Sequence, residues 1–177
     1  YYMTLLLRKF RAYEAHATNY FGAGFEHISQ QNLIGPGGVL PMTFDNVNIE
    51  TEALPHEDET FEVVLLCEVL EHFTNDPAAA LRELRRVLKP GGRLILSTPN
   101  VNRLNNVARM IAGSNIYDPY SGYGPYGRHN REYNRHEVLR LLEYLGFAID
   151  ESFTSDVHPN DTHYYDNPEK IYQLASH

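Results

Sequence analysis

The sequence predicts an α/β fold built on a doubly wound, mostly parallel sheet. Residues Phe61–Cys67 form a nearly continuous apolar run, which is typical of a strand covered on both faces in a parallel sheet. A helical pattern and the strand Arg93–Ser97 follow, and strands joined this closely through a helix form right-handed parallel crossovers in nearly all proteins. The helix Asn134–Leu145 and the strand Phe147–Phe153 continue the alternation that defines a doubly wound sheet.

The N-terminal part carries further signals of this kind. Leu and Phe at helical spacing predict a helix over Met3–Tyr13, and a short strand follows over Ala15–Phe21. Residues Phe25–Leu33 predict a helix that Gly35-Pro36-Gly37-Gly38 stops. β-branched and aromatic residues then predict an extended segment over Val39–Glu50.

Capping residues place the ends of the two clearest helices. Asp76-Pro77 is a good N-cap and first-turn pair, and Lys89-Pro90-Gly91-Gly92 ends that helix in a tight turn. Asn134 and Glu137 form a capping-box pair at the start of the later helix, which Gly146 ends. The buried stripe of the first helix is predicted to be Leu81, Leu84, Val87 and Leu88.

Composition limits the classes of function. The length of 177 residues suits one domain, and 42% hydrophobic with 21% charged residues is typical of a globular protein. Fifteen Lys and Arg against 23 Asp and Glu give a net charge of −8, which argues against a broad nucleic-acid surface. Because no apolar run approaches the roughly 20 residues of a membrane helix and Cys67 is the single cysteine, we expect a soluble, cytoplasmic protein without a membrane span.

Ligands of doubly wound sheets bind beyond the carboxyl ends of the strands. Four stretches of this chain follow predicted strands and are therefore the candidate site. They are residues 19–24, 50–55, 67–73 and 98–103.

Four ordered motifs in the middle of the chain carry a resemblance to a known family. They are Glu50-Thr51-Glu52-Ala53-Leu54-Pro55, Thr60-Phe61-Glu62-Val63-Val64, Cys67-Glu68-Val69-Leu70-Glu71-His72 and Arg85-Arg86-Val87-Leu88-Lys89-Pro90-Gly91-Gly92. Together they resemble class I S-adenosylmethionine-dependent methyltransferases, type 11-like, over residues 50–100, with looser agreement as far as Phe153. The resemblance implies a Rossmann-like methyltransferase fold with S-adenosylmethionine as cofactor.

The family's Gly-rich loop after the first strand is missing from this chain. Gly22-Ala23-Gly24 lies too close to Phe61 to replace it, because two further strand and helix pairs must fit between them. We therefore expect Tyr1–Tyr13 to be the helix after the missing loop, and residues 1–177 to be a single methyltransferase domain that is incomplete at its N-terminus. Tyr2 would then lie at the edge of the cofactor pocket.

The resemblance also implies cofactor contacts after the second and third strands. Where the family has a carboxylate for the ribose hydroxyls, this chain has Asn19 and Tyr20, which can hydrogen-bond a hydroxyl or have no ligand role. Glu50, with Thr51 beside it, takes the position that receives the adenine amino group; the alternative is a solvated loop acid.

After the fourth strand, the resemblance places Cys67 and Glu68 beside the reactive methyl group and Val69 along the cofactor. We expect Cys67 to be a small buried residue rather than a nucleophile. His72 is a candidate general base for a hydroxyl proton, the alternative being a role in fixing its loop. His129 is a second candidate base.

Acceptor specificity in this family usually comes from segments inserted after the fourth and fifth strands, here residues 101–133. Tyrosine rings in this stretch offer flat surfaces with a hydroxyl at the edge, and arginines bind anionic groups. We interpret it as a lid over the acceptor, against the alternative of a Tyr-rich surface or a dimer contact. The candidate acceptor-binding residues are Tyr123, Tyr126, Arg128, Arg131 and Tyr133.

The sequence thus predicts an S-adenosylmethionine-dependent methyltransferase that modifies an oxygen, less readily a nitrogen, of a small molecule or glycan intermediate. The alternative is a non-catalytic methyltransferase-like scaffold, because the Gly-rich loop and the ribose carboxylate are missing. A nicotinamide dehydrogenase fits the Glu50–Pro55 segment poorly. Asp156, His158, Asp161 and His163 are interpreted as a solvated loop, so no metal is assigned.

Overall fold

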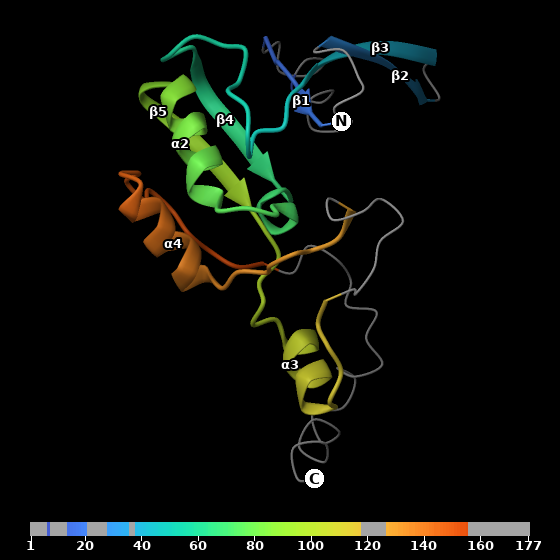
Figure 1. Cartoon of the computed structure of the whole chain (residues 1–177), viewed down its shortest axis with the longest axis vertical. Coiled ribbons are helices and arrows are strands. Elements are labelled where there is room, and N and C mark those ends of the chain that lie inside the picture. The colour runs from blue at the N-terminus through green and yellow to red at the C-terminus, as the bar shows by residue number, and fades with distance from the viewer. Residues whose placement is uncertain (1–6, 8–13, 21–27, 36–37, 118–126, 156–177) are drawn as a thin grey trace. The chain divides into compact units, whose positions relative to one another are not determined.

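The computed structural model describes residue 7 and residues 14–20, 28–35, 38–117 and 127–155. The chain divides into two compact units, Tyr1–Asp58 and Glu59–His177, and each is described by itself (Figure 1). Most of the helix predicted over Met3–Tyr13 lies outside the described residues, as do Tyr2, Tyr123, Tyr126 and the segment from Asp156 to His163.

The first unit contains a three-stranded sheet in the order β1-β3-β2. Strand β1, Thr18–Asn19, runs parallel to β3, Gly38–Asn46, with Thr18 beside Asp45. Strand β2, Ile28–Gly35, pairs antiparallel with β3 along its whole length. The alternating side chains of Met42 and Phe44 are each 1% exposed and form the centre of this unit's core.

The helix predicted over Phe25–Leu33 is wrong, because Ile28–Gly35 is a strand. Its backbone groups pair with β3 from Ile28 opposite Asp45 to Gly35 opposite Gly38. Gly38 has a φ of +107°, which glycine adopts without the steric cost of a Cβ, and it stands directly at the hairpin end. Pairing with a neighbouring strand therefore overrides a local helix preference that is small.

The second unit is organised around two parallel strands joined by a helix. Strand β4, Phe61–Cys67, leads through the short 3₁₀ turn η1, Leu70–His72, into helix α2, Pro77–Val87. Strand β5, Leu88–Ser97, then lies parallel to β4, with Cys67 opposite Ser97. Figure 1 shows α2 beside this strand pair, as the predicted crossover requires. Parallel strands and helices confirm the predicted α/β class.

Helix α2 has the predicted N-cap but a different C-terminal end. The Asp76 carboxylate accepts the Ala78 N–H at 2.9 Å, and Pro77 opens the helix. The predicted turn at Lys89–Gly92 lies inside β5, whose pairing shifts register between Phe61 and Val63. Gly91 has a φ of +77°, so the backbone changes direction there as an irregularity within the strand, and the strand continues after it.

One face of the β4–β5 pair stays exposed among the described residues. The side chains of Leu81 and Val87 on α2 are fully buried, and Leu66 on β4 is 5% exposed. Val63 and Ile95, which alternate to the other face, are 48% and 52% exposed. Strand β4 was expected to be buried on both faces, but among the described residues only one of its faces is buried.

Two further helices complete the described part of this unit. Helix α3, Leu104–Ile111, has no side-chain cap at its N-terminus and was not among the predicted helices. Helix α4, Arg135–Tyr144, carries the predicted capping box of Asn134 and Glu137. Gly146 has a φ of +81°, and Phe147 N–H donates to Leu142 O at 3.0 Å, which confirms the predicted end.

The strand predicted over Phe147–Phe153 is wrong, because this segment joins no ladder among the described residues. Side chains hold it instead: Arg135 donates to the Ser152 hydroxyl at 2.8 Å, and Arg93 lies 3.8 Å from the Asp150 carboxylate. Strand propensity alone does not provide a pairing partner. None of the described helices has the length and apolar character that crossing a membrane requires.

Candidate functional site

The carboxyl ends of β4 and β5 meet at Glu68 and Ser97. Glu68 N–H donates to Ser97 O at 2.9 Å, and the Ser97 hydroxyl donates to the Glu68 carboxylate at 2.7 Å. Glu68 has a φ of +55°, a left-handed conformation that costs a non-glycine residue about 1–3 kcal/mol and is concentrated at functional sites. The strand end is therefore a tightly bonded, strained turn.

Cys67, Glu68 and Val69 are all exposed at this turn. The expectation that Cys67 is buried is wrong, because Cys67 alternates to the same face as Val63 and Leu65. Three consecutive exposed residues directly after a parallel strand give this edge a surface that a ligand can contact.

Glu71 anchors the turn that follows. Its side chain is 1% exposed, and its carboxylate accepts the Thr98 hydroxyl at 2.9 Å. Burial raises the pKa of the Glu71 carboxyl, while hydrogen bonds, including the one from Thr98, act in the opposite direction. The Glu71 carbonyl accepts the backbone N–H of Asn130 at 2.7 Å, so η1 is tied to the loop that contains His129.

The hydrogen bonds of His72 fix the role of each ring nitrogen. Nδ1 lies 3.0 Å from the Arg128 carbonyl oxygen, which can only accept, so Nδ1 carries the proton. In the neutral ring the lone pair is then on Nε2. The Asn130 side chain donates to the His72 carbonyl at 2.8 Å and holds the backbone of the same residue.

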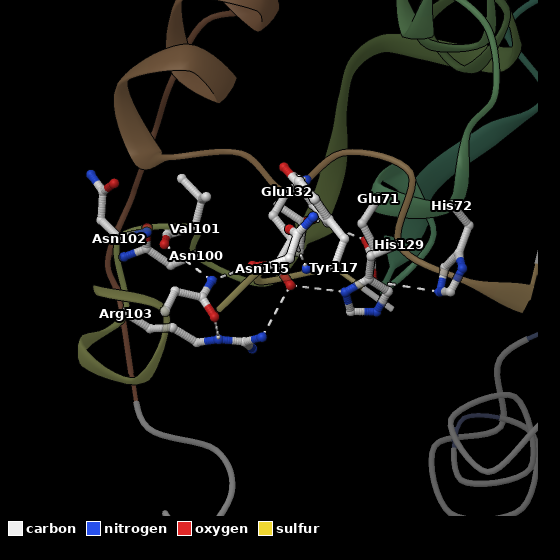
Figure 2. A network of polar contacts seen from close by, with 12 residues as sticks. Glu71, His72, Asn100, Val101, Asn102, Arg103, Asn115, Tyr117, His129 and Glu132 are labelled. Carbon is white, nitrogen blue, oxygen red and sulfur yellow. Dashed lines mark hydrogen bonds and ion pairs between the residues drawn. The ribbon is translucent and has the colours of Figure 1, made fainter. Parts of the chain in front are cut away.

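His129 is held in the same way by a carboxylate. Its Nδ1 lies 2.9 Å from Glu132 Oε1, so Nδ1–H donates to the carboxylate and the lone pair of the neutral ring is on Nε2. Glu132 is 3% exposed and also accepts from Arg103 at 3.0 Å and from Asn106 at 2.7 Å. Figure 2 shows Glu132 between Arg103 on one side and His129 on the other.

The two imidazoles lie against each other. Their ring centroids are 5.0 Å apart, with planes at 86°. One ligand atom each from Glu71, His72 and His129 falls within 4.8 Å of the other two. Two imidazole lone pairs and a carboxylate at one strand edge can accept a proton or hold a divalent cation.

Two of the acceptor-binding candidates, Arg131 and Tyr133, contact each other near the start of α4. Arg131 donates to Glu137 at 2.8 Å, and its guanidinium lies 4.8 Å from the centroid of the Tyr133 ring. Tyr133 is 5% exposed and its backbone bridges to Asn100. Arg128 Nε donates to the Asn130 side chain at 3.1 Å. An acceptor role for these residues stays a prediction.

Sequence comparison relates part of the chain to a known family. The model of the methyltransferase domain family matches residues 23–96. The ubiquinone biosynthesis O-methyltransferase of Cereibacter sphaeroides is 49% identical over 73 residues, which are 41% of this chain and 29% of that protein. Residues 23–96 are therefore similar to S-adenosylmethionine-dependent methyltransferases, which supports the resemblance seen in the sequence.

Two further proteins are similar to parts of this chain. A "probable S-adenosylmethionine-dependent methyltransferase" of Mycolicibacterium smegmatis is 33% identical over 99 residues, 56% of this chain and 33% of that protein. A solved S-adenosylmethionine-dependent methyltransferase from Thermotoga maritima is 24% identical, with a TM-score of 0.45 over 60% of this chain and 46% of that one. The chain thus spans about a third of the length of the curated relatives, 29% and 33%.

The remaining candidates for cofactor contacts lie in the first unit. Asn19 ends β1, where its side chain accepts the Tyr20 N–H at 2.9 Å. Glu50 N–H donates to the Asn48 side chain at 3.1 Å, and Thr51 N–H donates to the Asn48 carbonyl at 2.9 Å. Since β1 and β3 are parallel neighbours, these residues follow the same edge of their sheet. Their cofactor contacts stay predictions.

Sequence reasoning missed the residues that support the two histidines. Glu132 carried a usable signal, because it stands three residues after His129. Thr98 lies in a stretch that follows a predicted strand, but its bond to Glu71 joins residues far apart in sequence. Asn106 gives no local signal, since its partners Glu132 and Val101 meet it only in the folded chain.

Proposed function

We propose that this chain is part of an S-adenosylmethionine-dependent methyltransferase that methylates an oxygen of a small molecule or glycan intermediate. The supporting observation is the pair of imidazoles, His72 and His129, whose Nδ1 atoms are both committed as donors, so that the lone pair of each neutral ring is on Nε2; that of His72 lies 3.9 Å from the Glu71 carboxylate. Transfer to oxygen agrees with the name of the Cereibacter sphaeroides relative, an O-methyltransferase. Transfer to nitrogen is the less favoured form of this proposal.

The residues at the end of β4 suit the cofactor. When bound, S-adenosylmethionine supplies an activated methyl carbon for an in-line displacement, so the protein mainly aligns the acceptor and excludes water. Cys67, Glu68 and Val69 would hold it, because they are exposed at a strand end where such ligands bind. The described residues 101–117 and 127–133 would lie toward the acceptor, and the bond from Asn130 N–H to the Glu71 carbonyl holds the His129 loop at this edge.

In this mechanism His129 is the base. Its Nε2 accepts the acceptor's hydroxyl proton as the oxygen takes the methyl group, and Glu132 stabilises the resulting imidazolium, as a carboxylate does in other carboxylate–histidine pairs. The Arg103 and Asn106 bonds keep Glu132 in place.

The test measures formation of S-adenosylhomocysteine by the full protein with panels of phenols, sugars and amines. We expect His129→Gln to lower kcat by about 10²–10⁴-fold, the range of general base catalysis, with cofactor binding unchanged. The control is His136→Gln, because His136 is exposed on α4. Cofactor binding without turnover on any acceptor, or no cofactor binding at all, would instead support the non-catalytic scaffold.

One observation favours a second form of the mechanism. The ligand atoms of Glu71, His72 and His129 cluster closely enough to share a divalent cation, which would bind the acceptor oxygen directly. Chelation separates the two forms. Activity that survives EDTA supports the imidazole base, whereas activity lost to EDTA and restored by a divalent cation supports the metal form.

A further inference from the structure

We propose that the first unit contains a transition-metal site made of His16, Asp45 and His56. This site is separate from the cluster at the end of β4 and is independent of the proposed methyl transfer. One ligand atom each from these three residues lies within 4.8 Å of the other two. Two imidazoles and one carboxylate are a ligand set that zinc and its neighbours in the first transition row accept.

The backbone brings these three residues together from separate segments. Asp45 lies in β3 opposite Thr18 of β1, and Asp45 N–H donates to the Ala17 carbonyl at 2.9 Å, next to His16 in the chain. His56 follows a tight turn in which its N–H donates to the Leu54 carbonyl at 2.8 Å, and Leu54 is 8% exposed. The segment before β1 is thereby bonded to the end of β3, and His56 reaches them through its contact with Asp45.

The spacing suits ligands of one ion. His56 Nε2 lies 3.2 Å from Asp45 Oδ2. Two ligand atoms at about 2.0–2.1 Å from a tetrahedral zinc are themselves about 3.3 Å apart, so this pair needs little adjustment. The His56 and Asp45 side chains are 14% and 20% exposed, which limits competition from water.

His16 distinguishes a metal site from a simple ion pair. Its ring meets the His56 ring edge to face, with centroids 5.3 Å apart and planes at 78°. A second imidazole beside the His56–Asp45 pair supplies a third ligand, which a metal site uses and an ion pair does not. The His16 side chain is 46% exposed and can rotate to complete the set, with Glu14, 3.9 Å from its Nε2, on the solvent side.

The experiment titrates Zn²⁺, and Co²⁺ as a spectroscopic probe, into the metal-free full protein. A His72→Gln/His129→Gln background removes the other candidate cluster. We expect one equivalent of metal and the visible absorption of tetrahedral Co²⁺. Loss of outer-shell partners already costs about 10–100-fold in affinity, so His56→Ala should weaken binding by about 100-fold or more.

His16→Ala tests the same site at an exposed position, where the fold tolerates the change, and Asp45→Asn keeps the side-chain shape while removing the charge. Both are expected to weaken binding, and His136→Ala serves as the matched surface control. The proposal is overturned if the background binds no stoichiometric metal. It is equally overturned if His16→Ala and Asp45→Asn leave the affinity unchanged, whichever residues then hold the ion.

Discussion

At the scale of single residues, the Glu132 carboxylate is the centre of the polar network. It is almost fully buried and accepts hydrogen bonds from His129, Arg103 and Asn106. A buried carboxylate is stable only when such donors satisfy it. The orientation of the His129 ring therefore depends on a residue that need not contact the substrate.

The first prediction removes this acceptor. Glu132→Ala leaves the fully buried Asn106 amide short of a partner, so we expect the free energy of unfolding to fall by about 1–3 kcal/mol. Urea unfolding of the variant measures the loss. Glu143→Ala is the matched control, because Glu143 is exposed on α4 and should change stability by less than about 0.5 kcal/mol. Equal stability of the two variants would contradict the role given to Glu132.

Residue types alone identified His72 and His129, because an imidazole at a strand end or in an inserted loop indicates acid–base chemistry. The contact between their rings and the protonated Nδ1 of each could not be predicted, since both depend on Arg128 and Glu132 in the folded loop. Local chemistry indicated the candidates, and tertiary contacts gave their arrangement.

At the scale of elements, helix α2 is fixed by one buried side. Leu81 has no exposed surface in this helix. We expect Leu81→Ala to destabilise the protein by about 2–5 kcal/mol, from lost burial and the cavity that remains. Denaturant unfolding at equilibrium provides the value. The control is Leu104→Ala on α3, where Leu104 is 59% exposed, and it should lower the free energy of unfolding far less. An equally large loss in both variants would contradict the assignment of the Leu81 effect to burial.

Helix α4 adds a pH dependence to stability. The hydrogen bond from Asn134 N–H, followed by Arg131, lowers the pKa of the Glu137 carboxyl below its ordinary 4.5. A lowered folded pKa contributes stability that is complete above the unfolded value and is lost as pH falls through the folded one. Glu137→Gln, which can still fill the capping box, should cost about 0.5 kcal/mol at neutral pH.

The difference between wild type and Glu137→Gln is expected to shrink as the solution is acidified below the ordinary carboxyl pKa. Urea unfolding of both proteins across this range measures it. Asn134→Ala is the companion variant, since it removes the cap at every pH and should cost about 1 kcal/mol. A difference that stays constant on acidification would contradict the assigned cause.

Elements with local end signals were predictable, and elements that depend on partners were not. The helix ends were predictable because nearby residues alone determine them. These residues are Asp76-Pro77, the Asn134 and Glu137 pair, and Gly146. The strand Ile28–Gly35 needs β3 to form, and the segment 147–153 has the composition of a strand without a ladder to join. Pairing over long sequence distance decides both cases.

At the scale of the whole molecule, the family match runs from residue 23 to residue 96 and so includes sequence from both compact units. The net charge of −8 opposes binding to polyanions. An uncharged or cationic ligand is therefore the more favourable partner, and the sulfonium cofactor of this family is cationic at its reactive centre.

The last prediction concerns this cofactor. A ligand that binds only the folded protein stabilises it by about 2.7 kcal/mol at 100 times its Kd, so saturating S-adenosylmethionine should raise Tm in a thermal unfolding scan. Val69→Arg should abolish that rise, because it places a bulky cation where the cationic cofactor is expected to pack, at a side chain that is 36% exposed and contributes little to the core. Leu104→Arg, at a more exposed position, should leave the rise intact. A full rise of Tm in Val69→Arg would contradict the proposal that the cofactor binds at the end of β4. The absence of a rise in the wild type would contradict the proposal that the protein binds S-adenosylmethionine.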